Sequence, residues 1–138
     1  MRRSIQTHNC ATFAEITLVL TDDIGIRDVH QRCFGQDSTT DVISLNYDAI
    51  PGEAGGRSGE LFVNLVCAWQ NARKTWAPSQ ELALYIAHGC DHLAGATDDT
   101  PEGRQTMRRR ELRWLREAAQ EDLLDKPLLI PVDESRRP

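Results

Sequence analysis

Three short runs of apolar side chains in this sequence predict β-strands. Residues 15–20 (EITLVL) and 60–65 (ELFVNL) are rich in β-branched and other large apolar side chains. Residues 41–47 (DVISLNY) alternate apolar and polar side chains with period two, as a half-buried strand does. Residues 51–59 contain four glycines and a proline, so they are expected to form a flexible connection. This connection lacks the GK[ST] ending of a phosphate-binding loop.

Helical patterns follow the first and the third of these strands. The polar run 21–23 can cap a helix that extends to about Phe34 and is followed by a polar loop over residues 35–39. A second helix is expected over residues 66–76. The side chains of the first helix that are expected to face inward are Ile24, Val29 and Cys33.

Two longer helices are predicted in the second half of the chain. Pro78 can occupy the first turn of one helix, which is apolar on most sides up to His88 and is therefore expected to be central in the fold. The other helix begins with Thr100 as its cap and Pro101 as its first residue, and it is expected to end near Ala119. The side chains of this last helix that are expected to be buried are Met107, Leu112, Trp114 and Leu115.

The strands and helices mix without strict alternation, which predicts an α+β fold with a short mixed sheet of about three strands covered by helices. With 138 residues, 40% of them hydrophobic, the chain is most simply one domain over residues 1–138, with a core over 15–119 and tails at 1–14 and 126–138. The sequence contains no apolar run long enough to span a membrane, and no apolar segment follows the basic start as in a secretory signal. We therefore expect a cytoplasmic protein with no membrane partner. Its four cysteines are far apart and are expected to be reduced thiols.

Two histidines four residues apart, His88 and His92, form the most informative motif of the chain. On a helix such residues lie on one face, about 40° and about 6 Å apart, so that both imidazoles can reach one ion. Gly95 can end the helix in a left-handed conformation, after which Asp98 can return to the same ion. The spacing therefore predicts a metal site formed by these two histidines and this aspartate.

The histidine pair is also compatible with two further roles. Histidines near the end of a helix interact favourably with the negative end of its dipole. The same spacing occurs in zinc peptidases of the HExxHxxGxxH type, whose general base is the glutamate directly after the first histidine. This chain has Gly89 at that position, which disfavours peptide hydrolysis. Cys90 points away from the histidine face and is expected to belong to the core.

Arginines gather directly after the motif, although the net charge of the chain is −5. They are Arg104, Arg108, Arg109, Arg110, Arg113 and Arg116. A local basic surface can contact nucleic-acid phosphates within an acidic protein, which makes Arg104, Arg108 and Arg109 candidate contacts. A solvated helix face with pairs to Glu111 and Glu117 is equally compatible with the sequence.

Four segments together resemble the YbeY family of bacterial endoribonucleases and rRNA maturation factors. Residues 88–99 (HGCDHLAGATDD) are similar to the family signature, which is close to HGxLHLxGYDH. Residues 39–45 (TTDVISL) resemble its PTDVLSF segment, and residues 59–64 (GELFVN) resemble its GDIxIx strand. Residues 81–82, followed on the same helix by His88 and Gly89, resemble its EEL…HG segment. The similarity covers about residues 16–115.

This resemblance implies a metal-dependent, single-strand-specific endoribonuclease that matures the 3′ end of small-subunit (16S) rRNA and takes part in ribosome quality control. The implied partners are rRNA and the small ribosomal subunit, without an organic cofactor. The family's metal is one zinc ion held by three histidines, which correspond here to His88, His92 and Asp98. Aspartate is an acceptable zinc ligand at about 2.0–2.2 Å, although its charge makes the ion a weaker Lewis acid. The adjacent Asp99 remains an alternative third ligand.

Other departures from the family pattern concern residues around the site. The family has an arginine in a YRGKD-like run where this chain has Phe34, and Arg32 lies out of register. A strand and a helix that precede the first strand in the family are expected to be missing or reduced. Asp91 replaces a leucine and is expected either beside the ligands or exposed near the helix end. Thr40 is expected to be structural.

A site with three protein ligands leaves a position for water or a phosphoryl oxygen, which supports metal-assisted hydrolysis. An acid near the ion could orient the water, and the candidates are Asp41, Asp91 and Asp99. The alternative function is a ribosome-associated rRNA-binding or rRNA-processing factor with a structural metal and little catalysis. The altered ligand and the missing arginine favour this alternative slightly.

Overall fold

In the computed structural model, residues 13–72 and 77–121 are described, and they form a three-stranded sheet and four helices. The strands are β1 (Phe13–Thr21), β2 (Val42–Tyr47) and β3 (Arg57–Asn64), and the helices are α2 (Asp23–Phe34), α3 (Leu65–Asn71), α4 (Pro78–Leu93) and α5 (Pro101–Gln120). Every predicted strand and helix is present, with ends that differ by a few residues. Residues 73–76, at the end of the second predicted helix, lie outside the described residues.

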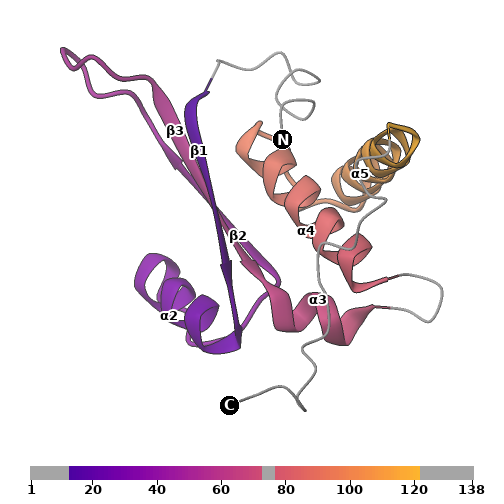
Figure 1. The fold of residues 1–138 in the computed structure, drawn as a ribbon. Coiled ribbons are helices and arrows are strands. Elements are labelled where there is room, and N and C mark those ends of the chain that lie inside the picture. The colour runs from indigo at the N-terminus through magenta and orange to yellow at the C-terminus, as the bar shows by residue number, and fades with distance from the viewer. Residues whose placement is uncertain (1–12, 73–76, 122–138) are drawn as a thin grey trace, which may run out of the picture.

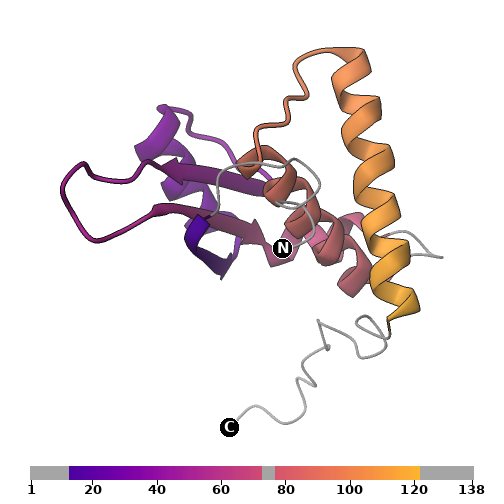
Figure 2. The ribbon, with the colours of Figure 1, turned by 90° about the horizontal axis from the view of Figure 1, so that it is seen from above.

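Strand β3 is the centre of the sheet, in the order β1-β3-β2. It pairs parallel to β1 and antiparallel to β2, so the sheet is mixed as predicted. Helix α2 lies on one side of the sheet, α3 and α4 lie on the other side, and α5 packs outside α4 (Figures 1 and 2). The α+β fold is therefore confirmed, with the histidine helix between the sheet and α5.

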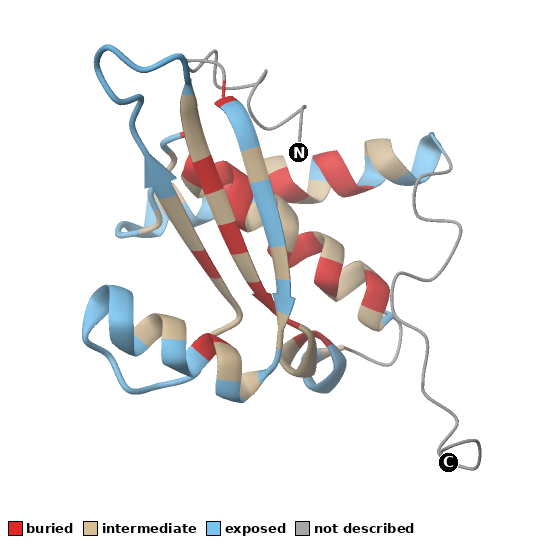
Figure 3. Cartoon of the chain, turned by 60° about the vertical axis from the view of Figure 1, so that its left-hand side comes forward, coloured by how far each residue is buried: buried red, intermediate tan, exposed pale blue. Residues whose placement is uncertain are grey.

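The face of β3 that α4 covers is the main part of the core. Leu61 and Val63, two positions apart on this strand, are fully buried. Buried positions alternate with less buried ones along part of β3 (Figure 3). Helix α4 lies close to the sheet at Gly89, where an added Cβ would be 2.8 Å from the Leu61 Cδ2 atom and 3.0 Å from the Val42 Cγ2 atom. The Ser44 hydroxyl donates a 3.0 Å hydrogen bond to the Gly89 carbonyl. Gly89, at the position where the zinc peptidases have their glutamate, thus allows the helix to pack closely on the sheet.

The inward face of α2 differs from the prediction. Ile24 is 81% exposed and Cys33 is exposed, whereas Ile26 is fully buried. Asp22 caps the helix by accepting a hydrogen bond from the Gly25 N–H, which fixes the rotation of its first turn. The stripe through Ile26 and the half-buried Val29 faces the sheet. Positions 24 and 26 lie about 200° apart on a helix, so Ile24 faces solvent.

Helix α5 buries three of the four predicted side chains, Met107, Trp114 and Leu115, while Leu112 is half-buried. Cys90 of α4 is buried as predicted, and burial raises the pKa of its thiol to about 11. Cys33, Cys67 and Cys90 are free thiols.

The predicted N-terminal tail, the C-terminal tail and the reduced N-terminal unit fall largely outside the described residues. Among the helices that are described, none combines the length and the apolar character needed to cross a membrane.

Candidate metal centre

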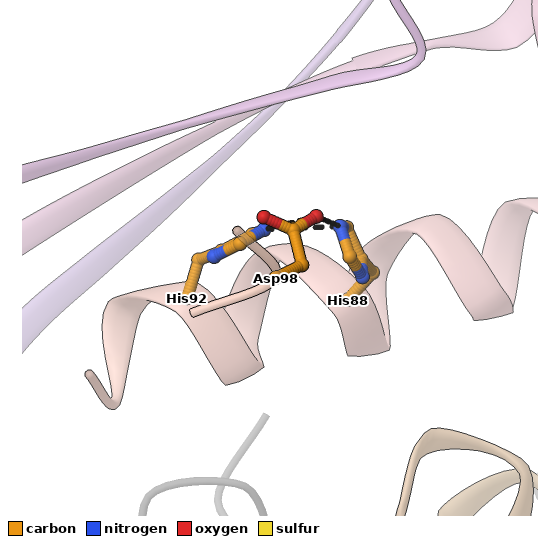
Figure 4. A group of neighbouring side chains, drawn as sticks. All are labelled: His88, His92 and Asp98. Atoms are coloured by element: carbon orange, nitrogen blue, oxygen red, sulfur yellow. Dashed lines mark hydrogen bonds and ion pairs between the residues drawn. The ribbon is translucent and has the colours of Figure 1, made fainter. Parts of the chain in front are cut away.

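Helix α4 and the turn after it bring three side chains to one point. His88 and His92 lie on the same face of α4, and Asp98 reaches back to them from the following loop (Figure 4). Gly95 makes this return possible with a φ of 101°, the left-handed conformation that the sequence predicted. The Ala96 N–H donates a 3.0 Å hydrogen bond to the Asp91 carbonyl and closes the turn.

The nitrogen and oxygen atoms of the three side chains converge at distances that suit one ion. The Nε2 atoms of His88 and His92 are 3.0 Å apart, and each lies 3.6 Å from the Asp98 Oδ2 atom. Two ligand atoms of a tetrahedral zinc site, each about 2.0–2.1 Å from the ion, are about 3.3 Å apart. The three atoms therefore form a set that could hold a metal ion.

The outer nitrogens of both rings are held by acceptors. The His88 Nδ1 atom lies 2.7 Å from the Glu111 Oε1 atom, and the His92 Nδ1 atom lies 3.0 Å from the Ala96 carbonyl oxygen. Because both partners accept, a proton on each Nδ1 satisfies them, and the Nε2 atom of a ring in its neutral form is then left with a lone pair. Two such lone pairs that face each other at 3.0 Å repel unless a proton or a metal ion lies between them. Such fixed orientation of the rings is typical of metal-ligating histidines.

The charges around His88 favour a cation at the same point. Burial by itself lowers the pKa of His88, but the hydrogen bond and charge of Glu111, together with the charges of Asp41 and Asp98, raise the pKa above its usual value. Glu111 is 2% exposed, so its carboxylate acts in a poorly solvated place. The carboxylates thus stabilise positive charge here, whether it is on the imidazole or on a bound ion.

The site opens into a cavity of about 560 Å³. The residues that line it are His30, Phe34, Gln36, Thr40, Asp41, Val42, Ile43, Ser44, His88, His92 and Asp98. Asp41 stands at the start of β2, where its Oδ1 atom accepts a 2.8 Å hydrogen bond from the Val42 N–H. The buried Asn64 holds this segment, because its backbone N–H donates to the Asp41 carbonyl and its side-chain amide donates to the Thr40 carbonyl.

The other predicted acids lie elsewhere. Asp91 is completely buried and forms an ion pair with Arg110, whose Nε atom is 3.1 Å from one carboxylate oxygen. The expectation that Asp91 is exposed is therefore wrong, because α5 covers that side of α4. Asp99 is exposed and is not among the residues that line the cavity.

The three candidate RNA-contacting arginines are all exposed on α5, and their surroundings differ. The Arg104 Nη1 atom donates to the Asp98 carbonyl at 3.1 Å and so supports the loop that carries Asp98. Arg108 lines a second cavity of about 250 Å³ behind His88, together with Glu111. Arg109 lines a groove on another side of α5 with Arg113 and Arg116.

Glu111 is the site residue that the sequence interpretation missed. The sequence alone presents it as a possible pairing partner of the arginines on a solvated helix face. It lies four residues after Met107 and four before Leu115, so the three share one side of α5. An acid within an apolar stripe is a signal for a buried partner, because a carboxylate is rarely buried without one.

The fold and the site define a class of small α+β proteins in which a helix beside a mixed sheet presents two histidines four residues apart, and the following loop returns a third side chain to them as a group that could hold a metal ion. Within this class the chain belongs to the YbeY family. The family model described as endoribonuclease YbeY matches residues 1–119.

Two curated relatives illustrate this membership, and both carry the name endoribonuclease YbeY. The one from Rhodopirellula baltica is 35% identical over 96 residues, covering 67% of this chain and 48% of the relative. The one from Salinibacter ruber is 31% identical over 110 residues, covering 75% of this chain and 70% of the relative. The chain thus spans about half the length of the first relative.

A solved structure supports the fold. The solution structure of TM1509 from Thermotoga maritima matches 99% of this chain and 86% of its own, with a TM-score of 0.58 and 21% sequence identity. At this identity the likeness concerns the fold alone.

Proposed function

We propose that this protein is a zinc-dependent endoribonuclease that hydrolyses phosphodiester bonds in single-stranded RNA, with His88, His92 and Asp98 as metal ligands. The observation that carries the proposal is the pair of Nε2 atoms 3.0 Å apart, each on a ring whose Nδ1 is already held by an acceptor. Family membership supports RNA as the substrate, since the relatives are named endoribonucleases. We further propose that the substrate is the 3′ end of small-subunit rRNA.

Each residue of the cavity has a distinct task in this proposal. When bound, zinc supplies a Lewis acid that lowers the pKa of a water molecule and polarises the phosphoryl group. Glu111 keeps the proton of His88 on Nδ1, so that Nε2 remains free to bind. Asp41, which lines the same cavity and is near enough to raise the pKa of His88, orients the attacking water and accepts its proton.

The test is cleavage of matched single-stranded and duplex RNA by the purified protein, before and after removal of metal with a chelator. Cleavage of the single-stranded RNA alone, lost with the chelator and restored by zinc, is the expected result. Bound metal without cleavage of any RNA would instead indicate the rRNA-binding factor with a structural metal.

Changing Glu111 to glutamine is expected to weaken zinc binding about 10–100-fold, because the charge that orients His88 is lost while the size of the side chain is kept. Competition with a chelating dye measures the affinity without reference to activity. Glu102→Gln is the matched control, since Glu102 is exposed in the first turn of the same helix. Equal zinc affinity for Glu111→Gln and the control would show that Glu111 does not contribute to zinc binding.

Reversing the charge of Arg109 is expected to weaken RNA binding several-fold. It is also expected to reduce the slope of log affinity against log salt concentration by about one, as the loss of one phosphate contact does. Arg109 lies beside Arg113 and Arg116 on an exposed part of α5, where a phosphate backbone can approach. Binding is measured as a function of salt concentration for Arg109→Glu and for Arg32→Glu, an equal charge change on α2.

A further inference from the structure

Phe34 presents an exposed aromatic ring to the metal cavity. The side chain is 52% exposed, although it is large and apolar, and it lines the same cavity as His88 and His92. His30, one turn earlier on α2, lines the cavity as well, and its ring centroid is 5.8 Å from that of Phe34 at an interplanar angle of 70°. The two rings form an edge-to-face pair on the α2 side of the cavity, which we call the aromatic wall.

The aromatic wall is held in place by the end of α2 and the loop that follows. Gly35, with a φ of 67°, ends the helix directly after the phenylalanine. The His30 Nδ1 atom donates a 2.8 Å hydrogen bond to the Ser38 carbonyl, which fixes the imidazole. Arg27 binds both carboxylate oxygens of Asp37, at 2.6 and 3.0 Å, and ties the same loop to α2. A ligand that uses this wall therefore meets a His30 ring that is already hydrogen-bonded and a loop that is tied to α2.

The rest of the cavity offers little to a phosphate apart from a bound metal. Among the described residues that line it there is no lysine or arginine, and Asp41 and Asp98 are acidic. Phe34 itself occupies the position at which the family pattern has an arginine. Within this cavity, an RNA strand therefore depends on the metal and on uncharged contacts more than on positive side chains.

We propose that Phe34, supported by His30, stacks on a nucleobase of single-stranded RNA next to the phosphate at the metal site; this rests on the proposed function. Single-stranded RNA is commonly bound by stacking unpaired bases on phenylalanine or histidine rings. Stacking tolerates any base, because every base has a π face. A base inside a duplex is covered by its neighbours, so the aromatic wall selects single strands.

The proposal is tested by the affinity of the zinc-loaded protein for a short labelled RNA, with the RNA checked for cleavage after each measurement. Phe34→Ala is expected to raise the dissociation constant about tenfold, whereas Phe34→Tyr keeps nearly wild-type affinity. Phe34→Leu, which is apolar but cannot stack, is expected to lie close to the alanine variant. Ile24→Ala on the same helix is the control, since Ile24 is exposed and does not line the cavity.

A second experiment removes the nucleobase from the RNA and leaves the Phe34 ring in the protein. An abasic site moved along the RNA is expected to weaken binding to the wild type about tenfold at one position, and to have no further effect at that position on Phe34→Ala. Such coupling between ring and base shows direct contact. The proposal would be overturned if Phe34→Ala lost as much affinity for the abasic RNA as for the intact RNA, or if Phe34→Ala bound the intact RNA as tightly as the wild type. Melting temperature and zinc content of the variant are measured in parallel and are expected to match the wild type.

Failure of this inference can be told apart from failure of the proposed function. If the wild type cleaves single-stranded RNA but ring and base show no coupling, the function stands and the stacking proposal is wrong. If coupling is found but no RNA is cleaved, the aromatic wall binds RNA and the catalytic proposal is wrong.

Discussion

Replacing Asp91 by alanine is expected to lower the free energy of unfolding by about 3–5 kcal/mol. Asp91 is completely buried, and its carboxylate oxygens lie 3.1 and 3.2 Å from the Arg110 Nε atom, on a side chain that is 18% exposed. Without Asp91, the Arg110 guanidinium would remain between α4 and α5 with its charge uncompensated. A loss of this size is a large part of the roughly 5–15 kcal/mol that stabilises a typical domain.

The matched variant removes both charges. Asp91→Ala combined with Arg110→Met is expected to recover most of the lost stability, because a buried pair replaced by apolar groups is often nearly neutral. Urea denaturation of wild type, both single variants and the double variant gives the four free energies. Equal stability of Asp91→Ala and wild type would mean that the pair is not buried in solution as it is in the structure.

Replacing His92 by alanine is expected to reduce RNA cleavage by roughly a thousandfold or more, because loss of the ion removes several kcal/mol of transition-state stabilisation, at about 1.36 kcal/mol for each tenfold change in rate. His92 is only half-buried, so the fold is expected to persist. Initial cleavage rates on single-stranded RNA, with circular dichroism of the same samples, measure both effects.

The control for this variant is Asp99→Ala. Asp99 is charged, exposed and adjacent to the proposed ligand Asp98, but it does not line the cavity. Its substitution is expected to leave the cleavage rate within about twofold of wild type. Undiminished cleavage by His92→Ala would contradict a catalytic role of the metal, whatever the behaviour of Asp99.

The elements and the ligand geometry could be predicted from the sequence because both depend on local spacing. The four-residue separation of His88 and His92 sets their common face on any helix, and Gly95 permits the turn that returns Asp98. The alternation of apolar residues likewise indicates β2 and β3. These features need no knowledge of which element packs on which.

The features that could not be predicted depend on tertiary contacts. Ile26 and not Ile24 is buried because α2 lies on the sheet with one particular rotation. Glu111 meets His88, and Arg110 meets Asp91, because α5 packs beside α4. Sequence spacing cannot relate residues on two helices whose packing is unknown.

The metal content of the purified protein tests the proposed site most directly. Wild type, Asp98→Ala and Asp99→Ala are compared by elemental analysis after loading with zinc and desalting. We expect about one zinc per chain in the wild type and in Asp99→Ala, and little in Asp98→Ala. No metal in the wild type after loading, or full retention in Asp98→Ala with loss in Asp99→Ala, would contradict the site formed by His88, His92 and Asp98.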